Sequence, residues 1–420
     1  MLRVLVALTA CSCACTARAD GFDLGQQLST LNGVAYARSI TFTGGNALIG
    51  DVIGSEPANA RDVAALVRID QPNVFLNARA LLDYTGGTAR TDGRLNELGA
   101  RANVTQNVSV TVGKRIESLD VTQAFFPLAF FEKHPSNADI FDRYGDVEGA
   151  PIAEVKWVGE RSSLQAMVGN NHTSRTDTDI RDTQGASQLL RFATNWAGGS
   201  ASVLAGGHAG HFGSGGTFSM DVGANSTFYG GGWIERGSTR DSIGYAGAAI
   251  PATDPAGGNP IDRRNSGQYM WRTALGMQTT LPGGIDAIAE WQHDEARLDA
   301  AQWRNVTASI TANSAAIARG QFAAFGPLVA TANFLSTEGN LRDYFFVRLG
   351  KKVRAGTELS ARALYSPQDK GLLTVVQVTS DIDRRFSVDL ALSHAFGGGH
   401  SEYRVVGFST EIDAALRVRF

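Results

Sequence analysis

The sequence IDAALRVRF, residues 412–420, ends the chain and alternates between two kinds of residue. Its apolar positions are Ile412, Ala414, Leu416, Val418 and Phe420. Between them stand two arginines, Arg417 and Arg419, on the opposite face of a strand with a two-residue period. A soluble domain usually ends in a polar, frayed tail. This stretch therefore predicts a strand whose apolar face is buried against something apolar, and lipid is one candidate.

The same two-residue period recurs along the chain from Gly33 onward. It is clear in NVFLNARALLDY (73–84), NVSVTV (107–112) and SVDLALS (387–393), where Val, Leu and aromatic residues favour strands. Short connectors rich in turn-forming residues alternate with longer connections, which we place as follows: 45–60, 85–93, 115–151, 171–186, 209–216, 237–266, 295–339, 366–370 and 397–403.

This alternation of short and long connections is typical of a closed antiparallel transmembrane β-barrel, with tight turns at one rim and long loops at the other. A sheet can cross lipid only if it closes, because every backbone N–H and C=O must be paired. We therefore predict an all-β fold with about 18 strands. Residues 305–313 and 329–335 fit a strand or a helix, so 16 to 20 strands remain open. A soluble β-sandwich, propeller or solenoid is the alternative, and the absence of a fixed repeat argues against the last two.

The N-terminus predicts export. Arg3 precedes the apolar stretch 4–15, and Ala17-Arg18-Ala19 is a small-x-small cleavage site, so residues 1–19 are expected to be a signal peptide. Cleavage there would remove all 3 cysteines. An alternative cut in Leu8-Thr-Ala-Cys11 would leave a lipidated Cys11. With cleavage after Ala19, residues 20–32 are expected to be a short periplasmic segment and residues 33–420 to form the barrel. The net charge of −3 does not suggest a nucleic-acid partner.

An exported chain of this length, without cysteine after cleavage and ending in Phe420, resembles the Gram-negative outer-membrane porins. The resemblance covers the architecture of residues 33–420, and no local motif matches a particular porin family. It implies an outer-membrane location, passive diffusion of small hydrophilic solutes or ions, and no cofactor. It also implies that the terminal Phe420, with the apolar residues at alternate positions before it, serves as the signal that the barrel-assembly machinery reads. A homotrimer is a possible assembly.

In many porins the connection after the fifth strand folds inward and narrows the pore. Here that connection is residues 115–151. Its apolar run, residues 125–131, would be costly to expose and favours packing inside. We expect an acidic constriction from these residues: Glu117, Asp120, Glu132, Asp139, Asp142, Asp146 and Glu148.

Strand alternation assigns a set of arginines to the lumen: Arg68, Arg79, Arg101, Arg342, Arg348, Arg362, Arg417 and Arg419. Barrel closure would make them a loosely contiguous basic wall. An acidic loop opposite such a wall would create a transverse field that orients and selects solutes. The alternative is that the arginines are paired, because the same wall carries acids: Asp62, Asp70, Asp83, Glu97, Glu358, Asp389 and Asp413.

Enzyme and metal-site interpretations are weaker. The 7 histidines are scattered. His134-Pro-Ser136 could mimic a base and nucleophile, and His208-Ala-Gly-His211 could share a metal, but nothing fixes a third ligand. We therefore predict a protein that is not an enzyme and holds no metal. A structural barrel that sheathes a periplasmic or electron-carrying protein, and an outer-membrane hydrolase, are the alternative functions. The Ala-rich connection 295–339 could be a lid or a surface loop with a short helix.

Overall fold

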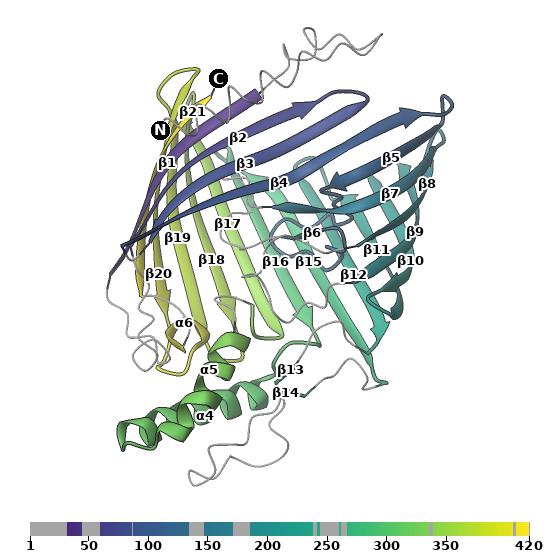
Figure 1. Cartoon of the computed structure of the whole chain (residues 1–420). Coiled ribbons are helices and arrows are strands. Elements are labelled where there is room, and N and C mark those ends of the chain that lie inside the picture. Colours follow the sequence, from purple (N-terminus) through teal and green to yellow (C-terminus); the bar gives the residue numbers. More distant parts are fainter. Residues whose placement is uncertain are drawn as a thin grey trace.

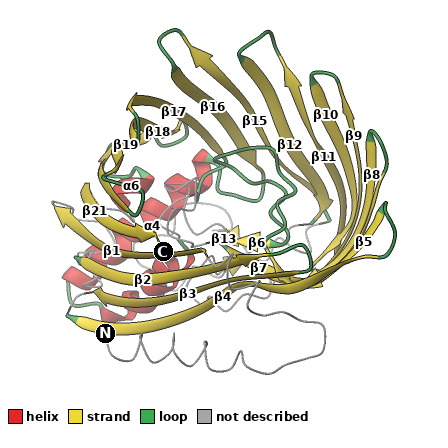
Figure 2. Ribbon diagram, turned by 90° about the horizontal axis from the view of Figure 1, so that it is seen from above, coloured by secondary structure: helices red, strands yellow, loops and turns green. Residues whose placement is uncertain are grey.

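The computed structural model describes residues 32–43, 59–85, 87–133, 147–170, 185–237, 242–243, 260–261, 267–335, 339–405 and 409–419. The expected signal peptide, Phe420 and three of the acids (Asp139, Asp142 and Asp146) lie outside these residues. The main sheet has 19 strands, of which the two-residue β6 (Glu132–Lys133) lies inside, leaving 18 in the wall. The predicted closed antiparallel barrel of about 18 strands is confirmed (Figures 1 and 2).

The wall strands follow one another around the barrel in chain order, each antiparallel to the last. They are β1 (Asn32–Thr43), β2 (Ala60–Asp70), β3 (Val74–Thr85), β4 (Thr88–Asn103), β5 (Val108–Arg115), β7 (Glu148–Val158), β8 (Ser162–Asn170), β9 (Ala186–Trp196), β10 (Gly199–His208), β11 (His211–Asp221), β12 (Ser226–Arg236), β15 (Tyr269–Leu281), β16 (Ile285–Asp294), β17 (Asp343–Arg354), β18 (Thr357–Ser366), β19 (Gly371–Asp381), β20 (Phe386–Phe396) and β21 (Thr410–Arg419). Strand β21 pairs with β1, from Val34 opposite Arg419 to Thr43 opposite Thr410, and this pairing closes the sheet.

The two stretches that fitted either a strand or a helix are helical. They lie in α4 (Ala300–Ala318) and α5 (Phe325–Phe334), which are joined through the short 3-10 helix η3 (Phe322–Ala324). Asp299 caps α4, because its side chain accepts hydrogen bonds from Ala301 N and Gln302 N at 2.9 and 2.8 Å. The Gln302 side chain accepts in return from Asp299 N at 2.9 Å, which completes a capping box.

The two rims of the barrel differ. The start of β1 and the end of β21 lie at one rim, and helices α4 and α5 lie at the other (Figure 1). The minor elements α6 (Glu402–Val405), β13 (Ser242–Ile243) and β14 (Pro260–Ile261) belong to connections of the helix-bearing rim. Among the described residues, no helix is long and apolar enough to cross a membrane.

Two of the expected long connections at this rim are in fact short. Only residues 86–87 separate β3 from β4, and only residues 209–210 separate β10 from β11. The segments predicted as loops, 88–93 and 211–216, are the first halves of β4 and β11. Glycine and polar residues dominate in both segments, so neither face shows the apolar alternation from which a strand is predicted.

Large apolar side chains cover the outside of the barrel. On the last strand Ile412 and Leu416 are exposed, whereas Asp413 and Ala415 are buried. The same contrast runs around the wall, with exposed outward side chains at Val63, Leu82, Leu164, Val203, Val347 and Leu390. A soluble protein rarely exposes a continuous apolar surface of this extent, and such a band is the expected surface of a lipid-embedded barrel.

Aromatic residues lie near both ends of this outward band. Tyr84, Trp271 and Tyr365 lie toward the helix-bearing rim, and Trp157 and Trp196 lie toward the other rim, all of them exposed. Aromatic rings are favoured at the two membrane interfaces, where an apolar body and a polar edge are both accommodated. Their positions are those expected of interfacial girdles.

Candidate functional site: the loop inside the barrel

The connection between β5 and β7 enters the barrel, where β6 lies beside β7 (Figure 2). Residues 116–133 of this connection, here called the inner loop, carry most of its apolar side chains. Four of these, Leu119, Leu128, Phe130 and Phe131, are buried against inward-facing side chains of β7 to β12: Ile152, Met167, Leu189, Leu204 and Trp233. The inner loop is thus held to the wall by a hydrophobic cluster rather than left free in water.

Glycines on the wall make room for this packing. The Phe130 and Trp233 rings meet edge to face with centroids 4.8 Å apart. A Cβ added at Gly213 or Gly215 of β11 would approach the Trp233 ring to 2.7 and 2.9 Å, so the ring lies over bare backbone. At Gly231 of β12 an added Cβ would lie 3.1 Å from Asp120 Oδ1 of the inner loop. The loop can come this close because these wall positions carry no side chain.

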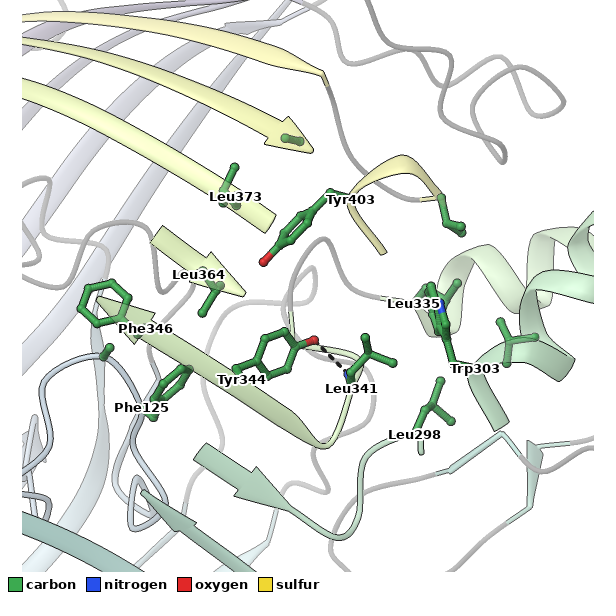
Figure 3. Close-up of a cluster of buried hydrophobic side chains, with 14 of the residues drawn as sticks. Phe125, Leu298, Trp303, Leu335, Leu341, Tyr344, Phe346, Leu364, Leu373 and Tyr403 are labelled. Atoms are coloured by element: carbon green, nitrogen blue, oxygen red, sulfur yellow. Dashed lines mark hydrogen bonds between the residues drawn. The ribbon is translucent and has the colours of Figure 1, made fainter. Parts of the chain in front are cut away.

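The apolar tip of the inner loop packs against a second part of the barrel wall, strand β17. Phe125 lies with its ring centroid 6.5 Å from that of Tyr344 and 6.4 Å from that of Phe346, both on β17 (Figure 3). This second cluster continues from β17 to the helices, through Leu341, Leu298 and Trp303 (Figure 3). The inner loop and the helix-bearing mouth therefore share one continuous apolar core.

Glu290 on β16 holds the tip by hydrogen bonds. Its carboxylate accepts from three consecutive backbone N–H groups, those of Gln123, Ala124 and Phe125, at 2.6, 2.9 and 3.3 Å. The Tyr229 hydroxyl donates a fourth hydrogen bond to Glu290 Oε1 at 2.8 Å. Successive N–H groups that converge on one anion form a strong, oriented contact. Glu290 is buried (3% exposed), so losing it would leave these donors unsatisfied.

The base of the inner loop is fixed by charge. Arg115 lies 3.1 Å from Glu117 and 3.1 Å from Glu154, and Gln165 Nε2 donates to Glu117 Oε1 at 2.9 Å. Asp120 Oδ2 accepts a hydrogen bond from Leu128 N at 2.8 Å. Burial beneath the loop raises the pKa of Asp120 well above its usual range, although the Leu128 hydrogen bond opposes the shift.

Of the four predicted acids that the structure describes, Glu117 and Asp120 take part in these loop contacts, and Glu132 and Glu148 lie on β6 and β7. Glu117 is paired with Arg115, and Glu148 is buried in an ion pair with Lys114. Glu132 is 4% exposed, on β6. Glu117 and Asp120 therefore hold the inner loop at its base, whereas the Glu148–Lys114 pair joins β7 to β5 within the wall. An acidic face toward open water would have to come from residues 134–146, outside the described part of the chain.

Most of the predicted wall arginines have partners. Arg417 lies 2.6 Å from Asp389, Arg419 lies 3.0 Å from Asp381, and Arg348 pairs with Glu358. The others are placed as follows: Arg362 donates to Gln377 Oε1 at 3.0 Å, Arg79 donates to the Tyr36 hydroxyl and lies 5.7 Å from its ring, and Arg68 lies 4.0 Å from Asp70. The alternative interpretation, in which the wall arginines are paired with neighbouring groups, therefore holds for much of this wall.

Two predicted arginines differ from this pattern. Arg101 lies on β4, half-buried, near the rim opposite the helices. Arg342 was expected on a strand but precedes β17 by one residue. Its guanidinium donates to Arg297 O at 3.1 Å and lies 3.7 Å from Asp299, so it helps to hold the connection leading to α4.

Sequence reasoning missed four charged groups that the fold brings to the lumen. Arg38 on β1 pairs with Asp413 at 2.8 Å, and Glu290 holds the loop tip. Arg191 on β9 and Arg272 on β15 have no hydrogen-bond or ion-pair partner among the described residues; Arg272 lies 5.1 Å from the Phe130 ring centroid. Alternation in 186–196 and 269–281 could have placed both arginines inward, but nothing in the sequence marks Glu290 as an anchor.

The helix-bearing mouth is tied together by Glu402 of α6. Its Oε1 accepts from Asn340 N and Asn340 Nδ2, both at 2.6 Å, and its Oε2 accepts from the Tyr344 hydroxyl at 2.6 Å. Tyr344 in turn accepts from Leu341 N at 2.9 Å (Figure 3). Trp303 of α4 donates to His400 O at 2.8 Å. Burial raises the pKa of Glu402, against the lowering effect of these donors.

The two large hydrophobic clusters leave one side of the lumen mostly to polar groups. They cover inward faces from β7 to β20, whereas the inward faces of β21 and β1 to β4 carry a smaller apolar cluster, Tyr36, Ala64 and Ala415, among many charged side chains: Arg38, Asp62, Arg79, Asp83, Asp92, Arg94 and Asp413. A water-filled passage is best accommodated along this polar face.

The histidine interpretations find no support in the described residues. His208 faces inward and shares a hydrogen bond of 2.6 Å with Ser187 Oγ, whereas His211 Nδ1 lies 2.8 Å from Arg236 O. Within the described ranges no group of three or more His, Cys, Asp or Glu side chains is placed to hold a metal ion. His134 and Ser136 lie outside those ranges.

No protein-family model matches the chain, and no curated protein matches its sequence. Solved structures share its fold. Acinetobacter baumannii OccAB1 aligns over 93% of this chain and 96% of its own, with a TM-score of 0.50 at 11% identity. Pseudomonas aeruginosa OccK1 (93% and 99%, TM-score 0.49, 8% identity) and the Salmonella typhi OmpF complex with daunomycin (93% and 97%, 0.44, 10%) are also similar. The likeness to OccAB1 thus concerns the barrel fold alone, at low sequence identity.

Proposed function

We propose that this chain is an outer-membrane porin that lets small hydrophilic solutes or ions diffuse passively through a lumen narrowed by the inner loop. One observation carries the proposal: the inner loop is fastened across the interior, with three backbone N–H groups on Glu290. Because a buried carboxylate holds the inner loop in place, the loop would narrow the lumen to a defined width. The outward apolar band and the girdle positions support the membrane setting.

Passage through such a site needs no chemical step. A hydrated solute would move along the polar face of β21 and β1 to β4, where paired charges such as Arg38 and Asp413 replace part of its hydration shell. Because most wall arginines are paired with acids, we expect weak charge selectivity. The barrel-assembly machinery, outer-membrane lipid and a homotrimer are the partners that this function implies.

The test is the conductance of the refolded chain, residues 20–420, in a planar bilayer under a KCl gradient. Discrete and stable openings with a small reversal potential are expected. A barrel that inserts but conducts nothing would refute the open-pore function and favour a barrel filled by a partner protein.

A further inference from the structure

A groove runs along the outside of the barrel at the closing seam of β1 and β21. It is lined by small outward residues, Ala37, Ser39 and Ala414, between the larger Val63 on one side and Val388 and Leu416 on the other. The pairing register places these side by side: Ala37 is opposite Leu416 on β21 and opposite Val63 on β2. Next to Val63, Leu82 of β3 adds a further exposed apolar side chain. The floor of the groove is formed by neighbouring small residues of β1 and β21.

One end of the groove carries a cation. Arg61, the second residue of β2, is exposed, belongs to the groove lining and has no hydrogen-bond or ion-pair partner among the described residues. It stands in one row of the register with Ser39 on β1 and Tyr84 on β3. Tyr84 is one of the girdle aromatics toward the helix-bearing rim. Arg61 is therefore placed at the level where a membrane changes from acyl chains to headgroups.

We propose that this groove binds an acyl chain of a phosphate-bearing lipid from the leaflet at the helix-bearing rim, with the Arg61 guanidinium on the phosphate and the Ser39 hydroxyl beside it. The proposal rests on the membrane setting of the proposed function, but not on conduction. A guanidinium offers a phosphate two parallel charge-assisted hydrogen bonds. The apolar floor below it matches a chain that leaves the headgroup and runs along the strands.

Charge complementarity favours a lipid over a second copy of this chain. The described outward positions of β20, β21, β1, β2 and β3 include no Asp or Glu. A subunit packed on this face through the same strands would bury Arg61 without a counter-charge, which is costly. An anionic headgroup supplies the missing charge.

Arg236 provides a matched control. It is also exposed, outward-facing and at the helix-bearing end of its strand, β12, but it donates to Gly267 O at 3.3 Å and does not line the groove. Val203, on the outside of β10, likewise controls for added bulk in the apolar band. Substitutions at Arg61, Ala37, Arg236 and Val203 all lie on the outside of the barrel, so the fold and the lumen should be unchanged by them.

The test is native mass spectrometry of the full mature chain in detergent, incubated with diphosphorylated lipid A or with its dephosphorylated counterpart. The parent chain should retain one phosphorylated lipid, and Arg61→Ala and Ala37→Phe should retain about ten-fold less, while Arg236→Ala and Val203→Phe behave like the parent. The proposal would be overturned if Arg61→Ala and Ala37→Phe retained as much phosphorylated lipid as the parent chain, or if the parent retained the dephosphorylated lipid equally well. So would a loss of oligomer mass in Ala37→Phe with lipid retention unchanged, because the groove would then be a subunit interface.

Discussion

The carboxylate of Glu290 on β16 lies 2.9 Å from the backbone nitrogen of Ala124, 166 positions earlier in the chain. This contact joins the barrel wall to the tip of the inner loop. It is one of four hydrogen bonds on the same carboxylate, and hydrogen bonds to charged groups contribute about 1.5–3 kcal/mol each. The backbone of the loop tip is therefore held to the wall by one buried side chain, in addition to the apolar packing of the loop.

Glu290→Ala should loosen the inner loop. The variant leaves three backbone donors and the Tyr229 hydroxyl without their acceptor, so states with the loop displaced should become more populated, by about ten-fold or more. Single-channel recordings should show larger and noisier openings. Asp286→Asn, on the same strand but exposed, is the control and should leave conductance unchanged. Identical conductance of Glu290→Ala and the parent would show that the loop does not limit the pore.

Gly231→Val should displace the same loop from the wall side. A Cβ at this position would lie 3.1 Å from Asp120 Oδ1 and 3.7 Å from Pro127 Cγ, and the valine methyl groups would reach further. We expect altered conductance with several sublevels in a barrel that still folds. Gly93→Val on β4 is the matched control, because an added Cβ there meets nothing within 4 Å. An unaltered conductance trace for Gly231→Val would mean that the loop does not lie against β12.

Removing one member of a wall ion pair should change charge selectivity. Asp389→Asn frees Arg417, which lies 2.6 Å from the Asp389 carboxylate, and the reversal potential should shift toward anions. The double variant with Arg417→Gln should return close to the parent value, because both charges are then gone. If Asp389→Asn produces no shift, this part of the wall does not face the conducting path.

The mouth should be more tightly closed at low pH than at neutral pH. Burial raises the folded-state pKa of Glu402 above its unfolded value, so its contribution to local stability is fully present below the unfolded pKa and is lost as pH rises through the folded pKa. Hydrogen exchange of the amides of residues 401–405, corrected for intrinsic rates, should therefore show easier opening as pH rises. Glu402→Gln should abolish this dependence. A pH dependence that persists in Glu402→Gln would assign it to another group.

Asp383, in the β19–β20 turn at the opposite rim, serves as a comparison of opposite sign. Hydrogen bonds from Phe386 N and Arg385 N lower the pKa of its carboxyl. Its contribution is therefore present above the unfolded pKa and is lost as pH falls through the folded pKa. Asp383→Asn should leave the pH dependence at the mouth unchanged.

The sequence by itself determined the barrel, its closing strand and the faces of that strand. In IDAALRVRF, Ile412 and Leu416 face outward and Arg417 faces inward, because a strand has a fixed two-residue period and lipid accepts only the apolar face. These are local rules, and they hold wherever an apolar alternation is present. They failed at residues 88–93 and 211–216, where it is absent.

Only the tertiary structure decided what fills and charges the lumen. Glu290 meets Gln123, and Arg38 meets Asp413, across 167 and 375 positions of the chain. No local pattern encodes such meetings, because they depend on barrel closure and on the path of the inner loop. Likewise, alternation placed Arg348 and Arg417 inward but could not show that Glu358 and Asp389 neutralise them. Periodicity selects the face of a residue, whereas its partner is selected by the three-dimensional closure of the sheet.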